Sequence, residues 1–291
     1  MKPSLFKAVL GSTTAIILAL SACDSQTDPA LAAAPVTAPT LSTVPAQRSA
    51  AWVPSMTDTW QWQLAGAVHT DRTATVVGID LFDADPATIA ALHANGKKVL
   101  CHFSAGSADI ALPDFASFDA ADMGGALDDR SGEVWLDTGS ENVRSIMQKR
   151  LDHARDRHCD GVVPDHVDAY SSKSGFTLTH ASQLSYNRFL AMEAHARGLA
   201  VGLKNDVGQL AELVNDVDFA VNEQCHQYGE CARYAVFVKA GKPVLNVEYA
   251  EIYRTEGSDR EALCAEAQQL GLETLVLAEA LDDSFRYACA G

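Results

Sequence analysis

The chain has few basic residues for its length, and this scarcity excludes several classes of partner. Its 291 residues include 22 Lys and Arg against 38 Asp and Glu, which gives a formal net charge of −16 with neutral His. Because the acids are spread along the chain, the surface repels nucleic acid and anionic lipid. The same charge attracts a cationic substrate, although acidity also serves solubility alone. We therefore expect no nucleic-acid partner.

Motifs that hold cofactors are also missing. No Gly-rich dinucleotide fingerprint follows the early apolar runs, and no phosphate-binding loop occurs. His, Cys and Asp do not occur at the spacing of a zinc site. The segment Ser104–Ser107 lacks the spacing of a Gly-x-Ser-x-Gly nucleophile elbow. The sequence therefore predicts neither an organic cofactor nor a metal.

The N-terminus has the pattern of an export signal. Lys2 and Lys7 precede an apolar run, Ala8–Leu20, that is too short to span a membrane comfortably as a mature helix. Leu-Ser-Ala directly before Cys23 resembles the bacterial lipobox. The pattern predicts a lipoprotein signal peptide at 1–22 and an exported protein anchored to a membrane through lipid on Cys23. The alternative is an ordinary signal peptide with a chance cysteine.

The rest of the chain divides into a linker and one folded domain. Residues 23–51 are rich in Ala, Thr, Pro and Ser, lack periodicity, and predict a flexible tether. Residues 52–291 have the length of a single α/β barrel. We expect a tethered monomer.

The cysteine count favours disulfides. Seven cysteines occur, and lipid on one of them leaves an even number in an oxidising compartment. One pair brackets a short loop, a second would tie the last helix to the C-terminal tail, and the third pair forms by default or stays as buried thiols. The two expected pairs are Cys225–Cys231 and Cys264–Cys289, and the remaining cysteines are Cys101 and Cys159.

Short apolar runs alternate with helical patterns from Trp60 onward. The predicted strands are Trp60–Leu64, Val76–Phe82, Lys98–Ser104, Gly161–Val167, Ala200–Asn205, Phe219–Glu223, Pro243–Tyr249 and Thr274–Ala278. The predicted helices are Pro86–Asn95, Asn142–Arg157, Ala181–Arg197, Val207–Asn215, Cys231–Ala240 and Asp259–Leu270. Eight such strands predict a closed (β/α)₈ TIM-type barrel with helices outside a parallel sheet. Residues 105–142 are expected to form an extended loop over one end.

Acids, amides and aromatics collect where the predicted strands end, which is where a parallel barrel carries its active site. Asp165 ends the fourth strand and Glu223 the sixth, so their carboxyl groups can face each other across a sugar ring. Glycoside hydrolysis needs such a pair. The alternative is that each carboxylate caps a helix or pairs with Lys204.

Eight short motifs, in order from about Trp60 to Tyr287, resemble those of glycoside hydrolase family 114, the endo-α-1,4-polygalactosaminidases. They are Trp60–Leu64, Ile79–Asp83, Cys101–Ser107, Gly132–Asp137, Cys159–Asp165, Gly202–Asp206, Asn222–Cys225 and Asn246–Tyr249. The resemblance implies a (β/α)₈ fold and a retaining mechanism. In it Asp165 is the nucleophile and Glu223 is the general acid and base. Lys204 is expected to keep Asp165 ionised, and burial or a neighbouring carboxylate to keep Glu223 partly protonated.

The resemblance also implies a set of sugar contacts. They are Asp80, Lys204, Asn205, Asp206, Glu248, Tyr249 and His166, with Trp62, Trp135 and Tyr170 stacking on sugar faces. For the two tryptophans, packing in the core is the alternative. The implied substrate is an extracellular α-1,4-linked galactosamine polymer, often partly deacetylated and therefore cationic, as in biofilm matrices.

Three positions depart from the family pattern. Val163 stands where a glutamate is usual, His166 where an asparagine is usual, and His102 where a tyrosine is commoner. We expect altered substrate preference or pH dependence, with the catalytic pair intact. Two other functions stay open: a non-catalytic polysaccharide-binding barrel, and a glycosidase for another α-linked amino sugar or galactoside.

Overall fold

The computed structural model of the protein describes residues 50–83, 85–127 and 132–289. The predicted signal peptide at 1–22, Cys23 and residues 24–49 of the predicted linker lie outside these ranges. Ala51 donates its N–H to the Gly198 carbonyl (3.1 Å), and Trp52 packs against the interior of the fold. The folded domain therefore includes the last residues that the sequence assigned to the linker.

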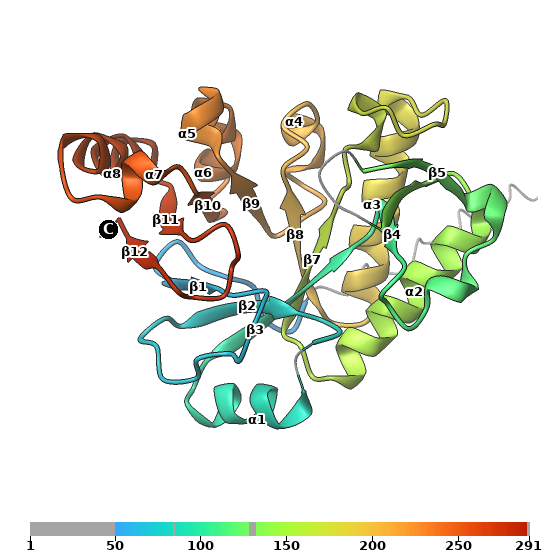
Figure 1. The fold of residues 1–291 in the computed structure, drawn as a ribbon, viewed down its shortest axis with the longest axis horizontal. Coiled ribbons are helices and arrows are strands. Elements are labelled where there is room, and N and C mark those ends of the chain that lie inside the picture. Colours follow the sequence, from blue (N-terminus) through green and yellow to red (C-terminus); the bar gives the residue numbers. More distant parts are fainter. Residues whose placement is uncertain (1–49, 84, 128–131, 290–291) are drawn as a thin grey trace, which may run out of the picture. The chain divides into compact units, whose positions relative to one another are not determined.

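Eight parallel strands follow one another in sequence order around a curled sheet (Figure 1). They are β1 (Trp60–Trp62), β2 (Val76–Asp80), β3 (Lys98–Ser104), β7 (Gly161–Asp165), β8 (Ala200–Lys204), β9 (Phe219–Glu223), β10 (Val244–Glu248) and β11 (Glu273–Leu277). Every neighbouring pair is parallel. The predicted (β/α)₈ barrel is confirmed, and each strand lies within two residues of its expected bounds.

A short antiparallel strand lies between the last and first parallel strands. After β11 the chain turns back as β12 (Arg286–Ala288), which pairs antiparallel with β11. The Arg286 guanidinium donates to the Trp60 carbonyl (2.6 Å), and the Leu281 carbonyl accepts from the Leu64 and Ala65 N–H groups. The C-terminal segment thus joins β11 to β1 in place of direct pairing, which the strand pattern did not predict.

Three of the helices begin at residues whose side chains cap them. The helices are α1 (Pro86–Ala94), α2 (Glu141–Asp156), α3 (His180–Ala196), α4 (Leu210–Leu213), α5 (Cys225–Tyr228), α6 (Ala235–Lys239), α7 (Glu251–Arg254) and α8 (Ser258–Leu270). Side chains of Asp85, Ser140 and Thr179 accept the N–H groups that the first turns of α1, α2 and α3 leave unpaired. Helix positions are therefore fixed by local chemistry as well as by packing.

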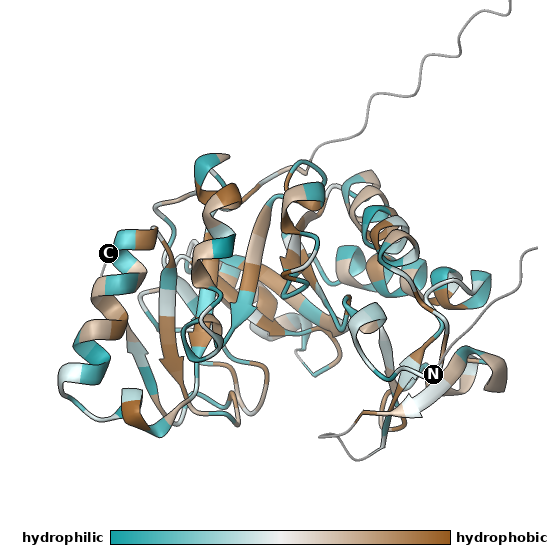
Figure 2. Cartoon of the chain, turned by 90° about the horizontal axis from the view of Figure 1, so that it is seen from above, coloured by the Kyte–Doolittle hydropathy of each residue, from teal (hydrophilic) through white to brown (hydrophobic). Residues whose placement is uncertain are grey.

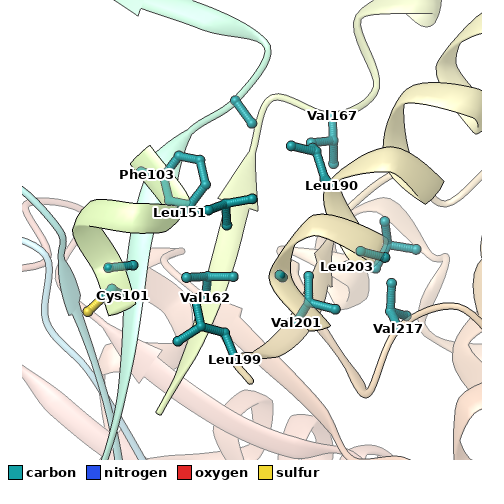
Figure 3. Close-up of a cluster of buried hydrophobic side chains, with 14 of the residues drawn as sticks. Cys101, Phe103, Leu151, Val162, Val167, Leu190, Leu199, Val201, Leu203 and Val217 are labelled. Carbon is teal, nitrogen blue, oxygen red and sulfur yellow. The ribbon is translucent and has the colours of Figure 1, made fainter. Parts of the chain in front are cut away.

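Strand side chains alternate between two cores, because successive residues point to opposite faces of a sheet. The first core fills the barrel interior and includes Trp60, Phe219 and Val247. The second lies between the sheet and the helices and includes Phe103, Leu190 and other residues labelled in Figure 3. Figure 2 shows the result, with strands mostly brown and helices banded in teal and brown.

Two predicted helices are shorter than expected. The pattern predicted a helix over 207–215, but only α4 is helical, because residues 205–209 turn sharply and Gly208 lies against the Tyr170 hydroxyl. The predicted helix over 231–240 divides into a 3₁₀ turn at Cys231–Tyr234 and the short α6. Here Cys231 is tied back to Cys225, which constrains the first turn.

The segment between β3 and α2 is more ordered than the predicted extended loop. It forms a small antiparallel sheet of β4 (Ser107–Asp109), β6 (Glu133–Leu136) and β5 (Met123–Ala126). Two 3₁₀ turns, Phe115–Ser117 and Ala120–Asp122, precede β5. Gly106 begins the segment, and a Cβ there would lie 1.8 Å from the His166 carbonyl oxygen, so only glycine allows this close approach. The small sheet is therefore anchored beside the end of β7.

Three disulfides form within the described residues; two are the expected pairs, and Cys101 and Cys159 form the third, which the sequence leaves open between a disulfide and buried thiols. The three are Cys101–Cys159, Cys225–Cys231 and Cys264–Cys289. The first joins β3 to the residues that precede its neighbour β7. In the described part of the chain, no helix combines the length and the apolar character needed to cross a membrane.

Candidate active site

The polar side chains that face the barrel interior gather at the carboxyl ends of the strands. Asp165 lies on β7 two residues after Val163, which belongs to the interior core, so it faces inward as well. The inward-facing set is Asp80, His102, Asp165, Lys204, Glu223 and Tyr249.

Lys204 joins the two predicted catalytic carboxylates. Its Nζ lies 2.7 Å from Glu223 Oε2 and 3.5 Å from Asp165 Oδ2, and its side chain is 1% exposed. The largest possible separation of these two oxygens is therefore the sum of the two distances. The structure brings Asp165 and Glu223 together as predicted, but it places Lys204 between them and not on the cleft surface.

Asp165 is held as an ionised carboxylate. Its burial favours the neutral form, but Lys204, His166 and His102 outweigh burial and hold the pKa well below its usual range. Oδ1 accepts the His166 backbone N–H (2.7 Å), and Oδ2 contacts His102 Nε2 (3.0 Å). Both oxygens are thus oriented, as a nucleophile requires.

Glu223 has different neighbours from those expected. The sequence suggested burial or a nearby carboxylate, whereas the structure gives it the Lys204 ammonium and the Tyr249 hydroxyl, which donates to Oε1 (2.7 Å). Asn205 Oδ1 accepts the Glu223 N–H (3.0 Å) and so fixes the end of β9. The Glu223 side chain is 26% exposed, so protons reach it from solvent.

Two hollows flank this pair. One of about 380 Å³ is lined by Glu223 and by residues of the β7, β8 and β9 loops, including Asp168, Tyr170, Asn205 and Asp206. The other, of about 190 Å³, is lined by Asp80, Asp83 and Asp85 together with the loop after β1. Acidic groups therefore line both hollows.

Asp206 and Tyr170 form part of the larger hollow. The Tyr170 hydroxyl and Asn187 Nδ2 donate to Asp206 (3.3 and 2.8 Å). Burial and the nearby Asp168 raise the pKa of Asp206 to about 8. Burial, with Asp206, also raises the pKa of Tyr170 to about 12. Asp206 and Tyr170 therefore add negative charge to this hollow only as the pH rises.

His166 and Trp135 meet at the small sheet. The His166 Nδ1 contacts Ser107 Oγ (2.9 Å), and its ring stands edge-on to Trp135. His166 has a positive φ of 57°, which turns the ring toward this sheet while its N–H stays on Asp165. The Trp135 side chain is half-buried and keeps some surface for a ligand.

Two predicted sugar contacts face elsewhere. Trp62 is 1% exposed and packs in the barrel interior above Gly78, which corresponds to the core alternative. Glu248 is fully buried and accepts the His226 N–H (2.8 Å) on the outer face of the sheet. Because Tyr249 faces inward, its neighbour Glu248 points outward, so the two cannot line one cleft.

Two residues that line the larger hollow were not predicted from the sequence. Tyr228 is 64% exposed, and Glu230 lies beside it on the loop that the Cys225–Cys231 disulfide closes. The sequence did contain a signal for Tyr228, because an aromatic residue lies between two closely spaced cysteines directly after a strand end.

One cluster has the composition of a metal site. The potential ligand atoms of Cys225, His226, Cys231 and Glu248 lie within 4.8 Å of one another. The two sulfur atoms are bonded to each other, so they are not thiolate ligands.

The family model for glycoside hydrolase family GH114 matches residues 41–291, which include the whole described fold. The chain belongs to this family. Its membership confirms the resemblance of the eight motifs and makes the protein a glycoside hydrolase.

Solved structures agree with this family. Ega3 from Aspergillus fumigatus, in complex with galactosamine, is 41% identical, with a TM-score of 0.77, and the match covers 83% of this chain and 98% of that one. The glycoside hydrolase domain of PelA from Pseudomonas aeruginosa, 17% identical with a TM-score of 0.61, covers 77% and 96% and shares the fold. An uncharacterized protein of Deinococcus radiodurans is 28% identical over 80% of this chain and 86% of its own.

Proposed function

We propose that this GH114 protein hydrolyses an α-1,4-linked, galactosamine-containing polysaccharide by a retaining mechanism. The observation that carries the proposal is the pair Asp165 and Glu223, held on β7 and β9 by one shared ammonium group. Retaining glycosidases hold their carboxyl groups about 5–5.5 Å apart, and inverting ones about 6.5–9.5 Å. The 3.5 and 2.7 Å contacts of Lys204 bring oxygens of the two carboxyl groups close together, which supports the shorter, retaining separation.

In the first step Asp165 attacks the anomeric carbon as the glycosidic C–O bond breaks, and Glu223 gives its proton to the leaving oxygen. The product is a glycosyl ester on Asp165. In the second step Glu223 takes a proton from water, the hydroxide forms the new C–O bond, and the ester bond breaks. Each carboxyl group then returns to its starting state.

Charge supports an amino-sugar polymer as substrate. Asp80, Asp83 and Asp85 lie on one side of the pair, and Asp168 and Glu230 on the other. Free amines on deacetylated galactosamine are cationic, and acidic walls raise their local concentration. The galactosamine bound to the 41% identical Ega3 also supports this substrate class.

The direct test incubates purified protein with partly deacetylated α-1,4-galactosamine polymer beside an Asp165→Asn variant. We expect the parent to release oligosaccharides, detected by mass spectrometry, and the variant to lose at least about 1,000-fold of the rate. If the Asp165→Asn variant released oligosaccharides as fast as the parent, Asp165 would not be the nucleophile. Retention of polymer without release by either protein would favour the non-catalytic binding barrel.

We propose further that the protein is exported and anchored through lipid on Cys23, because Leu-Ser-Ala-Cys follows a short apolar segment. Cys23→Ser should abolish labelling by a fatty-acid probe. Unchanged labelling would contradict the anchor.

A further inference from the structure

His102 lies between two acids at the catalytic end of the barrel. Its Nε2 is 3.0 Å from Asp165 Oδ2, and its Nδ1 faces Asp80 Oδ2 at 3.7 Å. We propose that His102 is a positioning residue for the nucleophile, holding Asp165 while Asp80 holds His102. The inference rests on the proposed role of Asp165.

The strand register sets this row of residues. Asp80 on β2 pairs with His102 on β3, and His102 pairs in turn with Val163 on β7. Asp165 follows Val163 by two residues and points to the same face. A shift of one residue in either pairing would direct one of these side chains to the outer core. The contacts therefore follow from backbone geometry and not from a flexible loop.

The imidazole has little freedom to rotate. His102 is 8% exposed, and the Trp62 ring stands edge-on to it with centroids 5.9 Å apart and planes at 86°. Trp62 is itself buried over Gly78. This gives the buried tryptophan a function in the site, although it has no free face for a sugar.

The surrounding charges favour a protonated imidazole. Asp80 on β2, Asp165 on β7 and Lys204 on β8 are the charged groups that act on it. Burial and Lys204 oppose the positive charge, but the two acids outweigh them and raise the pKa of His102 to about 9. The charged ring carries a proton on each nitrogen, so it donates from Nε2 to Asp165 and presents positive charge to Asp80, which faces Nδ1 as an ion pair at 3.7 Å.

The residue paired with His102 across the sheet supports the same arrangement. Val163 on β7 is fully buried there and carries no charge. A carboxylate there would compete for the imidazole protons, whereas valine leaves both for Asp80 and Asp165. The uncharged Val163 side chain is therefore compatible with the proposed contacts of His102.

Two substitutions of His102 distinguish a role as hydrogen-bond donor to Asp165 from a role in packing alone. In His102→Gln the amide nitrogen reaches the place of Nε2, whereas in His102→Asn it reaches only the place of Nδ1. We expect kcat to fall about 10-fold in His102→Gln and about 100-fold in His102→Asn, with KM little changed, because misplacement of about 1 Å has this cost. Equal kcat values for the two variants would overturn the proposal.

The pH profile provides a second readout. Activity of the parent should fall as the pH rises through about 9, where His102 loses its charge, and this limb should be absent in His102→Gln. A merely structural histidine would leave the limb unchanged, and an unchanged limb would count against the positioning role.

A titration of the His102 ring by NMR does not depend on the substrate. We expect the parent ring to titrate near pH 9 and the Asp165→Asn ring markedly lower. Titration near the ordinary value of about 6.5, or no effect of Asp165→Asn, would overturn the contact. If the titration holds while the parent leaves the galactosamine polymer intact, the proposed substrate fails and the positioning contact stands.

Discussion

Two residues of this site, Lys204 and His102, each contact two acidic side chains at once. Lys204 contacts both Asp165 and Glu223, and His102 contacts both Asp80 and Asp165. Removing one buried member leaves its partner's charge uncompensated, which costs more than the contact itself contributes. A substitution of any one of these residues should therefore also destabilise the charged form of its partners.

Asp206 gives a test at this scale. Its pKa of about 8 in the fold lies above its unfolded value of about 3.9, so the folded state binds more protons between these limits. The stability that the neutral form contributes is complete below about pH 4 and is lost as the pH rises to about 8. Asp206→Asn should remove this loss, on the order of a few kcal/mol. Thermal unfolding of both proteins from pH 4 to 9 measures the effect.

The difference in Tm between Asp206→Asn and the parent should grow over this range and then stay constant. Asp71→Asn, at an exposed loop position, is the matched control and should show no such trend. A constant difference across the range would contradict the raised pKa.

At the scale of elements, the strand ends and the loops that follow them contribute different parts of the site. Strand ends hold Asp165 and Glu223, while loops supply most of the walls of the two hollows. The loop after β9 is closed by the Cys225–Cys231 disulfide, whose cysteines have a sequence separation of only 6. It presents Tyr228 to solvent at the rim with little freedom to move.

We expect Tyr228 to stack on a sugar of the polymer beyond the cleaved bond. Tyr228→Ala should raise KM for long chains up to about 10-fold and leave kcat nearly unchanged, because an aromatic contact is worth about 0.5–1.5 kcal/mol. Steady-state kinetics on polymer and on short oligosaccharides separate the two constants. Tyr287→Ala is the control, since Tyr287 is exposed on β12 under the Arg260 guanidinium. Equal KM values for both variants would exclude this role.

At the scale of the whole molecule, disulfides and the C-terminal strand hold the barrel together. Cys101–Cys159 has a sequence separation of 58 and ties two neighbouring strands, whereas Cys225–Cys231 closes only a local loop. The β12 segment joins β11 to β1, where the ring of parallel strands would otherwise be open.

Removing the long-range disulfide should therefore cost more than removing the local one. Loop entropy predicts that Cys101→Ala/Cys159→Ala lowers the free energy of unfolding by about 4 kcal/mol, and Tm by roughly 10 °C. The matched control is Cys225→Ala/Cys231→Ala, with an expected loss of about 2–3 kcal/mol. Urea denaturation measures both. Equal losses would show that strain or packing, and not loop closure, sets the stability.

The sequence by itself determined the parallel barrel, its eight strands and the position of Asp165 and Glu223 at the carboxyl ends of their strands. Runs of apolar residues between helical patterns specify a covered parallel sheet, and such a sheet collects its strand-end residues at one edge. Asp165 and Glu223 could be identified because they end strands that lie two apart. The disulfide spacings and the family motifs were equally local signals.

Only the tertiary structure decided which neighbours these residues meet. Glu248 and Tyr249 are adjacent in the sequence and point to opposite faces, and Trp62 is buried under the same alternation. The contacts of Lys204 with Glu223 and of His102 with Asp80 join separate strands, so they depend on register and curvature, which no local pattern encodes. Electrostatic environment depends on these distances, and for that reason the charge state of the site followed from the fold and not from the motifs.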